Sequence, residues 1–342
     1  MQQGQPIIAV VTRDTRLAAL KARWATANQA LFRLEQAALH EAALRKSKRS
    51  SRSKNDDFDT ATEADEEAAD MLAEQEEYAD EDEAYQRSLQ ALLKQIDLGY
   101  PIRTVDRSFL PNFDFGRCVA VLVIGPDGLV ANTAKYVGDV PIIGINPDPV
   151  RNDGILLPFS VGEARSILQT TIARRAKTRD VTLAEANTND GQRMLAFNDF
   201  YIGASTHISA RYTLEAGSRM ESQSSSGILI STGAGSTGWL SSLFNMAAGF
   251  SRSFGGSVAE PVKLDWSDRR LIWAVREPFV SRHSHASLVA GTLAESEELV
   301  IGSQMPMGGV IFSDGVEADF LEFSSGTIAR ISVSRQSARL VV

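Results

Sequence analysis

The stretch VAVLVIGPDGLV, residues 119–130, decides how the rest of the chain is interpreted. Its first six residues are apolar and four of them are β-branched, which is typical of a strand buried on both faces of a parallel sheet. The run ends at the sequence Gly-Pro-Asp-Gly, residues 125–128, whose composition favours a turn with close backbone approach. Helix-compatible residues follow from Asn132. The stretch therefore predicts a strand, a turn and a helix of an α/β sheet.

A turn of this kind offers backbone N–H groups and a helix N-terminus to a phosphate. In open α/β sheets, ligands lie beyond the carboxyl ends of the strands, where Asp127 stands. The alternative is an ordinary strand–helix turn in which Asp127 caps the helix.

Three later motifs support the first interpretation. Asn146 follows the next apolar run, Asn198 and Asp199 form an amide–acid pair, and residues 232–239 read TGAGSTGW. Together with the turn at Asp127, these motifs resemble, in order, the landmarks of the NAD kinase family, which is related to the diacylglycerol and sphingosine kinases. The resemblance covers about residues 119–334.

The resemblance implies transfer of a phosphoryl group from MgATP to the ribose 2′-hydroxyl of NAD. Such a reaction needs a phosphate cradle, neutralisation of charge and a base near the hydroxyl. By resemblance, Asp127 is the catalytic base, while Gly125, Gly128 and Asn146 serve the phosphates and cofactor. Mg²⁺ is expected to be held mainly by ATP, and the sequence does not identify its protein ligands. Asn146 as a structural turn residue is the alternative.

The resemblance also implies a substrate site for NAD. Its residues are Asn198, Asp199, Thr237, Gly238, Trp239 and Ser242. A carboxylate beside an amide suits ribose hydroxyls, and a helix N-terminus after a Gly-rich segment favours anions. The alternatives are an Asx turn at Asn198 and a plain helix start capped by Ser236.

Four departures from the family pattern bear on the substrate. Pro126 replaces a Gly and removes an N–H donor, and Leu129 stands where a Thr is common. Asp199 is one methylene shorter than the family's Glu, and Ser226 replaces a family acid that recognises the nucleotide. Two other functions therefore stay open. One is a paralogous kinase for a sugar, nucleoside or lipid, and the other is a non-catalytic NAD(P)-binding module.

Composition limits the class of protein. The chain has 342 residues, 43% of them hydrophobic and 23% charged, as in globular proteins. No apolar run reaches the roughly 18 residues of a membrane span, and no signal-peptide pattern opens the sequence. Cys118 is the only cysteine, so we expect a cytoplasmic protein without an internal disulfide.

The net charge of −8 is unevenly distributed. Residues 55–86 hold fifteen acidic residues and no Lys or Arg, and without them 28 acidic residues face 35 basic ones. The remainder is thus mildly basic, which suits an anionic nucleotide. Aromatic residues do not interleave with the basic run at residues 45–54, so we expect no nucleic-acid partner.

We expect an α/β Rossmann-like phosphate-donor domain at residues 1–158, with an acidic insertion at about 46–83. The insertion should be disordered or a loosely helical, solvated arm, and a docking tail for a partner is the functional alternative. A mainly β substrate-binding and oligomerisation domain should follow at 159–334, and a C-terminal tail at 335–342. The family resemblance implies a homodimer or homotetramer. We interpret Ser313-Asp314-Gly315 as a structural hairpin and Arg276 as either near the cleft or in an ordinary ion pair. A metal site at His283 and His285 lacks a third ligand.

Overall fold

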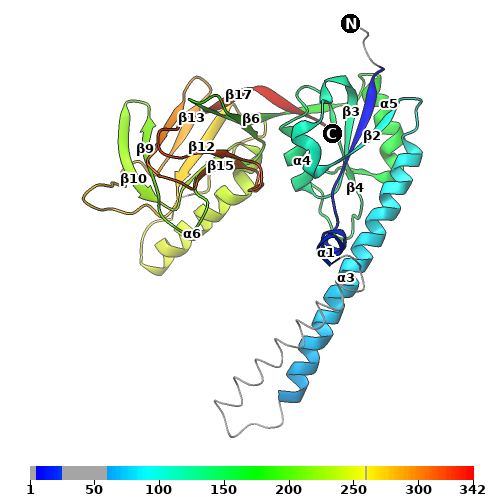
Figure 1. The fold of residues 1–342 in the computed structure, drawn as a ribbon, viewed down its shortest axis with the longest axis horizontal. Helices are drawn as coiled ribbons and strands as arrows, with labels where there is room; N and C mark the ends of the chain where they lie inside the picture. The colour runs from blue at the N-terminus through cyan, green and yellow to red at the C-terminus, as the bar shows by residue number, and fades with distance from the viewer. Residues whose placement is uncertain (1–4, 25–59, 259) are drawn as a thin grey trace.

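The computed structural model describes residues 5–24, 60–258 and 260–342, and it places side chains for 5–22, 77–258 and 260–342. Figure 1 shows an α/β part and a β part side by side, joined by strands that run between them. No helix within the described ranges is long and apolar enough to cross a membrane.

Four parallel strands build the α/β part. They are β1 (Ile7–Thr12), β2 (Ile102–Asp106), β3 (Cys118–Ile124) and β4 (Ile142–Asn146), in the order β4-β3-β1-β2, and the short β5 (Phe159–Ser160) continues beside β4. β1, β4 and the last five residues of β3 are buried. The continuous apolar runs follow from this, because helices cover both faces of the sheet.

The helices of this part are α1 (Arg16–Trp24), α3 (Thr60–Gln95), α4 (Asp127–Ala134) and α5 (Ala164–Ile172), with 3₁₀ turns η1 (Arg107–Asn112), η2 (Phe115–Arg117) and η3 (Val161–Glu163). Leu92 of α3, Ile96 directly after this helix and Leu168 of α5 pack on one face of the sheet, and Leu129 and Val130 of α4 pack on the other. The side chain of Thr15 caps α1, because its Oγ1 accepts from Ala18 N at 3.1 Å.

The β part contains a second sheet of six strands in the order β13-β12-β11-β8-β15-β16. These strands are β8 (Asp199–Ala204), β11 (Ile228–Ser231), β12 (Arg270–Val275), β13 (Ala290–Ala294), β15 (Gly309–Ser313) and β16 (Phe320–Glu322). Facing it lie β6 (Thr178–Thr188), β7 (Arg193–Ala196), β9 (Ala210–Ala216), β10 (Arg219–Ser225) and β14 (Leu299–Ser303). Phe200, Tyr212 and Phe323 are fully buried in the core that these strands form. After β11 come the turn η4 (Ala234–Thr237) and α6 (Trp239–Ser253).

Strand β17 (Ile328–Val341) joins the two parts. It pairs with β14 and along most of β6, and Leu340 then pairs in parallel with Ile142 of β4, which makes one sheet of eleven strands. Figure 1 shows this strand in red, crossing from the β part to the α/β part. The expected C-terminal tail at 335–342 is therefore wrong. Its polar residues alternate with buried Ala338, Leu340 and Val341, whose burial favours a strand.

The expected fold class is confirmed, since an α/β sheet with helices precedes a separate all-β sheet. The boundary at 158 needs correction, because β5 pairs with β4 and α5 packs on the parallel strands. Residues 159–172 therefore belong to the α/β part, and Ala164 and Leu168 anchor them because both are buried against its sheet.

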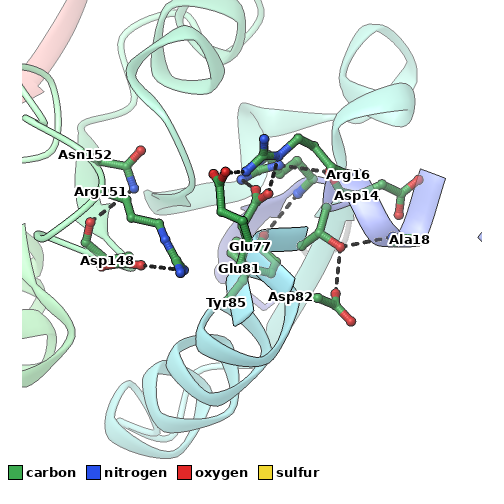
Figure 2. A network of polar contacts seen from close by, with 12 residues as sticks. Asp14, Arg16, Ala18, Glu77, Glu81, Asp82, Tyr85, Asp148, Arg151 and Asn152 are labelled. Carbon is green, nitrogen blue, oxygen red and sulfur yellow. Dashed lines mark hydrogen bonds and ion pairs between the residues drawn. The ribbon is translucent and has the colours of Figure 1, made fainter. Parts of the chain in front are cut away.

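Of the two alternatives for the acidic insertion, disorder is wrong for residues 60–83, which lie in the helix α3, whereas residues 46–59 fall outside the described residues. The side chains described in α3 include Glu81, which accepts from Arg13 and Arg16 at 2.5 Å each, and Asp82, which accepts from Thr15 at 2.6 Å. Figure 2 shows the contact of Glu81 with Arg16 of α1. Glu81 and Asp82 of α3 are thus matched by basic and hydroxyl groups from the segment between β1 and α1 and from the first residue of α1.

Candidate active site

A cavity of about 350 Å³ lies where the α/β part meets the β part. Its lining comes from the start of α4, the loop before β5, the start of β8, the η4–α6 segment and the turn after β15. These residues are Asp127, Gly128, Ile155, Leu156, Phe197, Asn198, Asp199, Ala234, Gly235, Thr237, Gly238, Trp239, Trp266, Asp314 and Gly315. The size fits part of a nucleotide-sized ligand.

Asp127 is the first residue of α4 and does not cap it, since the N-cap residue is Pro126 and no side chain caps the helix. The carboxylate instead accepts hydrogen bonds from Leu156 N at 2.9 Å and Ile155 N at 3.1 Å. The helix start therefore leaves its own N–H groups available beside the cavity. This arrangement excludes the alternative in which Asp127 serves as an ordinary cap.

The side chain of Asp314 organises the opposite wall. It accepts from the backbone N–H groups of Asn198 at 2.6 Å and Phe197 at 3.1 Å, and more weakly from Asp199 N at 3.4 Å. Asp314 has a φ of 54°, a left-handed conformation that short polar side chains tolerate better than most. One buried carboxylate therefore holds the chain segment that carries the predicted amide–acid pair.

Lys135 approaches Asp314 from the end of α4. Its Nζ lies 3.7 Å from Asp314 Oδ2 and donates to Ser313 Oγ at 2.9 Å, and both charged side chains are only 1% exposed. Burial lowers the pKa of Lys135 and raises that of Asp314, while the attraction between the two opposes both shifts. The neighbouring Tyr136 also donates to Asp319 in the same hairpin. Helix α4 thus carries Asp127 at one end and is tied to the β15–β16 hairpin at the other.

Asp199 lines the cavity as a second acid. Burial, followed by the nearby charge of Asp314, raises the pKa of Asp199 to about 7. Its carboxylate has no hydrogen-bond partner within the described part of the chain, and neither Asn198 nor Asp199 closes an Asx turn there. A carboxyl group whose pKa lies near neutrality can accept or donate a proton at physiological pH.

The η4–α6 segment forms the third wall. Gly235 passes so close to β8 that a Cβ there would lie 2.1 Å from the carbonyl oxygen of Asn198. Helix α6 begins at Trp239 with Gly238 as N-cap and no side-chain cap, because Ser236 Oγ donates to Gly233 O instead. The alternative in which Ser236 caps the helix is therefore excluded, and the positive end of the helix lies beside the cavity.

Trp239 belongs to an aromatic group next to this helix start. Its ring stacks on Tyr201 with centroids 5.9 Å apart and planes inclined by 9°. The guanidinium of Arg276 lies over both rings, 5.1 Å from the Trp239 centroid and 5.9 Å from that of Tyr201.

The structure brings most of the predicted site residues to one cavity. They are Asp127, Gly128, Asn198, Asp199, Thr237, Gly238 and Trp239. Gly125, Asn146 and Ser242 do not line it. Asn146 uses its amide in its own loop, donating to Asn152 O and accepting from Asp148 N. A Cβ at Gly125 would contact Leu129 at 2.9 Å, so this glycine permits close packing of the turn on α4.

Two residues of the site were not predicted as functional. Lys135 directly follows α4 with no motif around it, and Asp314 was interpreted as part of a structural hairpin. The Asp-Gly pair at 314–315 was the only sequence signal at this position, and it does not indicate a contact with a lysine so distant along the chain.

No group of three or more His, Cys, Asp or Glu side chains suited to a metal ion is present among the residues that the structure describes. The two helix starts suit phosphates, so the lining fits a nucleotide that carries its own Mg²⁺.

No family model matches this sequence, and no curated protein matches it significantly. Solved structures do match. Yeast NADH kinase complexed with NADH is 16% identical with a TM-score of 0.50, over 100% of this chain and 85% of that one. An NAD kinase from Archaeoglobus fulgidus in complex with ATP is 17% identical with a TM-score of 0.47, over 75% of this chain and 88% of that one. The likeness to the yeast enzyme spans both parts of the fold, and the chain therefore has the two-domain fold of the NAD kinases.

Proposed function

We propose that this protein is an NAD kinase-like phosphotransferase, which transfers the γ-phosphoryl group of ATP to the adenosine ribose 2′-hydroxyl of NAD. The observation that carries the proposal is the meeting of two uncapped helix starts and two acids, Asp127 and Asp199, in one cavity of an NAD kinase fold. Helix starts attract phosphates, and an acid can take the proton from a hydroxyl.

In the proposed reaction, the ribose 2′-oxygen attacks the γ-phosphorus, its proton passes to a carboxylate, and the bond to the β-phosphate oxygen breaks to release ADP. Gly128, with Gly125 behind it in the turn, lets the backbone at the α4 start approach the phosphates. Asn198, Asp199, Thr237, Gly238 and Trp239 surround the acceptor, and Ser242 lies one turn further along α6. Mg²⁺ carried by ATP would neutralise phosphate charge.

Asp127 is the first candidate for the base, because its carboxylate is fixed in place by two N–H groups at the helix start. Asp199 is the second, because its pKa of about 7 suits general-base catalysis at neutral pH. The pH profile separates the two. If Asp199 is the base, the acid limb of kcat lies near pH 7 in the wild type and disappears in Asp199→Asn.

The test of the function is a coupled assay with ATP, Mg²⁺ and NAD⁺. We expect turnover, and we expect Asp127→Asn to reduce kcat about 10²–10⁴-fold while NAD binding and folding stay near normal. Asp139→Asn is the matched control, because Asp139 is exposed on the loop after α4. Near-normal turnover by Asp127→Asn would remove this residue from the mechanism.

The same assay separates the alternatives. Turnover only with a sugar, nucleoside or lipid acceptor would indicate a paralogous kinase with the same fold. Saturable NAD(P) binding without any turnover would indicate a non-catalytic binding module.

We include a homodimer or homotetramer in the proposal. Helix α6 exposes Met246 and Phe250, and Phe254 follows directly after it with 83% of its surface exposed. A second copy covering this surface would remove it from water. Analytical ultracentrifugation at micromolar concentration measures the outcome, and a monomer would contradict this part of the proposal.

A further inference from the structure

Arg276 follows β12 and lies beside the loop that precedes β11. Its backbone accepts from Ser226 N at 2.9 Å and donates to Gly227 O at 2.8 Å, so its position in the chain is fixed. The next residue, Glu277, has a φ of 49°, which turns the chain immediately after Arg276. The half-buried side chain then extends over Trp239 and Tyr201.

The guanidinium of Arg276 has no acidic partner among the described residues, and none of its N–H groups donates a hydrogen bond there. Other arginines of the β part have acidic partners. Arg193, for example, forms a two-point contact with Glu185, and Arg269 binds both Glu295 and a backbone carbonyl. Arginine has five donors in one plane, and stacking on an aromatic ring uses only the face of that plane. The edge of the Arg276 guanidinium therefore keeps its full capacity for hydrogen bonds.

The surroundings favour an anion at this edge. Trp239 lines the cavity and is also the first residue of α6, a helix of fifteen residues whose start has no side-chain cap. The partial positive charge of the helix start and the charge of Arg276 thus both lie next to Trp239. At Ser226, next to the Arg276 backbone, the side chain is neutral and does not offset this charge.

We infer that Arg276, stacked on Trp239, forms an anion-binding subsite that takes a phosphate or carboxylate group of the nucleotide acceptor. This deepens the proposed function, on which it rests for the identity of the acceptor. The anion has two possible sources. It is either the diphosphate that every dinucleotide carries, or a carboxylate on the ring at the far end, as in nicotinic acid adenine dinucleotide.

The experiment measures equilibrium binding by calorimetry, so it does not require turnover. The ligands are adenosine, ADP, NAD⁺ and nicotinic acid adenine dinucleotide, and the variants are Arg276→Met and Arg276→Lys. Arg282→Met is the matched control, because Arg282 is exposed and forms no ion pair among the described residues. Thermal melts accompany each variant, and Arg276→Lys keeps the positive charge if Arg276→Met fails to fold.

A charge-assisted hydrogen bond corresponds to about a ten- to hundredfold change in Kd. We expect Arg276→Met to weaken ligands with a diphosphate by this factor and to leave adenosine unchanged, with Arg276→Lys in between. An equal loss for NAD⁺ and its nicotinic acid analogue assigns the diphosphate, whereas a loss confined to the analogue assigns the ring carboxylate.

Three results would overturn the subsite. In Arg276→Met, affinity could fall equally for adenosine and the charged ligands, or it could fall for no charged ligand. The third result is a wild-type protein that binds no charged ligand more tightly than adenosine. Failure of the proposed function looks different, since NAD⁺ would then show no turnover while the charge-dependent binding at Arg276 persists.

Discussion

Replacing Lys135 by Met tests whether the buried ion pair at the base of the cavity is a stabilising contact between the two parts. Methionine is close to lysine in length, so the variant removes the charge and one hydrogen bond without opening a large void. Asp314 then keeps its backbone N–H partners but loses its cation. Ser313 Oγ also loses the donor that now lies at 2.9 Å.

The burial of the pair sets the magnitude. Both side chains are 1% exposed, and removing one partner of such a pair costs about 3–5 kcal/mol because a charge stays buried alone. Asp314 retains hydrogen bonds from the backbone, so we expect a loss of about 3 kcal/mol in the free energy of unfolding. Without Lys135, the pKa of Asp314 rises further, since the cation no longer favours the charged form. The loss should therefore be smaller at pH 5 than at pH 8.

Urea unfolding at the two pH values measures both effects. Arg330→Met is the control, because its ion pair with Glu298 is exposed on both sides and should contribute less than about 1 kcal/mol at either pH. A loss below about 1 kcal/mol for Lys135→Met, or an equal loss at both pH values, would refute the reasoning. An equal loss at both pH values would mean that the methionine lowers stability by disturbing packing, and that the unpaired charge of Asp314 does not contribute to the loss.

Three other changes test separate features. Asp199→Asn should raise the free energy of unfolding relative to the wild type, and this difference should grow between pH 4 and pH 7 to at most about 4 kcal/mol. The reason is that the pKa of Asp199 is raised in the folded protein, so ionising this buried carboxyl lowers the stability of the wild type over this range. Thermal melts across pH measure the difference, and a difference that does not change with pH would contradict the prediction. Glu81→Gln should cost about 1 kcal/mol in urea unfolding, since Arg13 and Arg16 lose a partly exposed partner, and an unchanged midpoint would show that α3 does not stabilise α1. Gly235→Ala should destabilise the protein and weaken nucleotide binding, because the added Cβ meets a backbone carbonyl. Gly249→Ala should instead stabilise the protein by about 0.5–1 kcal/mol, because the added Cβ lies in open space on α6. Equal melting temperatures for the two variants would contradict this prediction.

The predictions that succeeded depend on local chemistry. The central strand and its turn were predicted from a continuous apolar run that ends in Gly-Pro-Asp-Gly, and β3 with α4 occupies that stretch. Asn198 and Trp239 were expected at the site from the resemblance of residues 198–199 and 232–239 to family motifs, and both line the cavity. Here the residues that determine the conformation are neighbours in the sequence.

The predictions that failed depend on contacts between distant segments. The acidic run reads as disordered by charge, but Glu81 has its cations at Arg13 and Arg16, which are more than sixty residues earlier. The segment 335–342 reads as a tail until β6 and β4 supply its partners. Lys135 is separated from Ser313 by 178 residues, and a helix position gives no sign of the charge it will meet.

The contacts that sequence could not predict also decide how the cavity responds to a ligand. Strand β17 is continuous through both parts, and α4 is tied by Lys135 and Tyr136 to the hairpin that holds Asn198 and Asp199. A hinge motion between the parts would separate a buried charge pair, at a cost comparable to a large share of a typical domain's stability. A ligand in the cavity therefore meets a frame in which the two parts of the protein are held together.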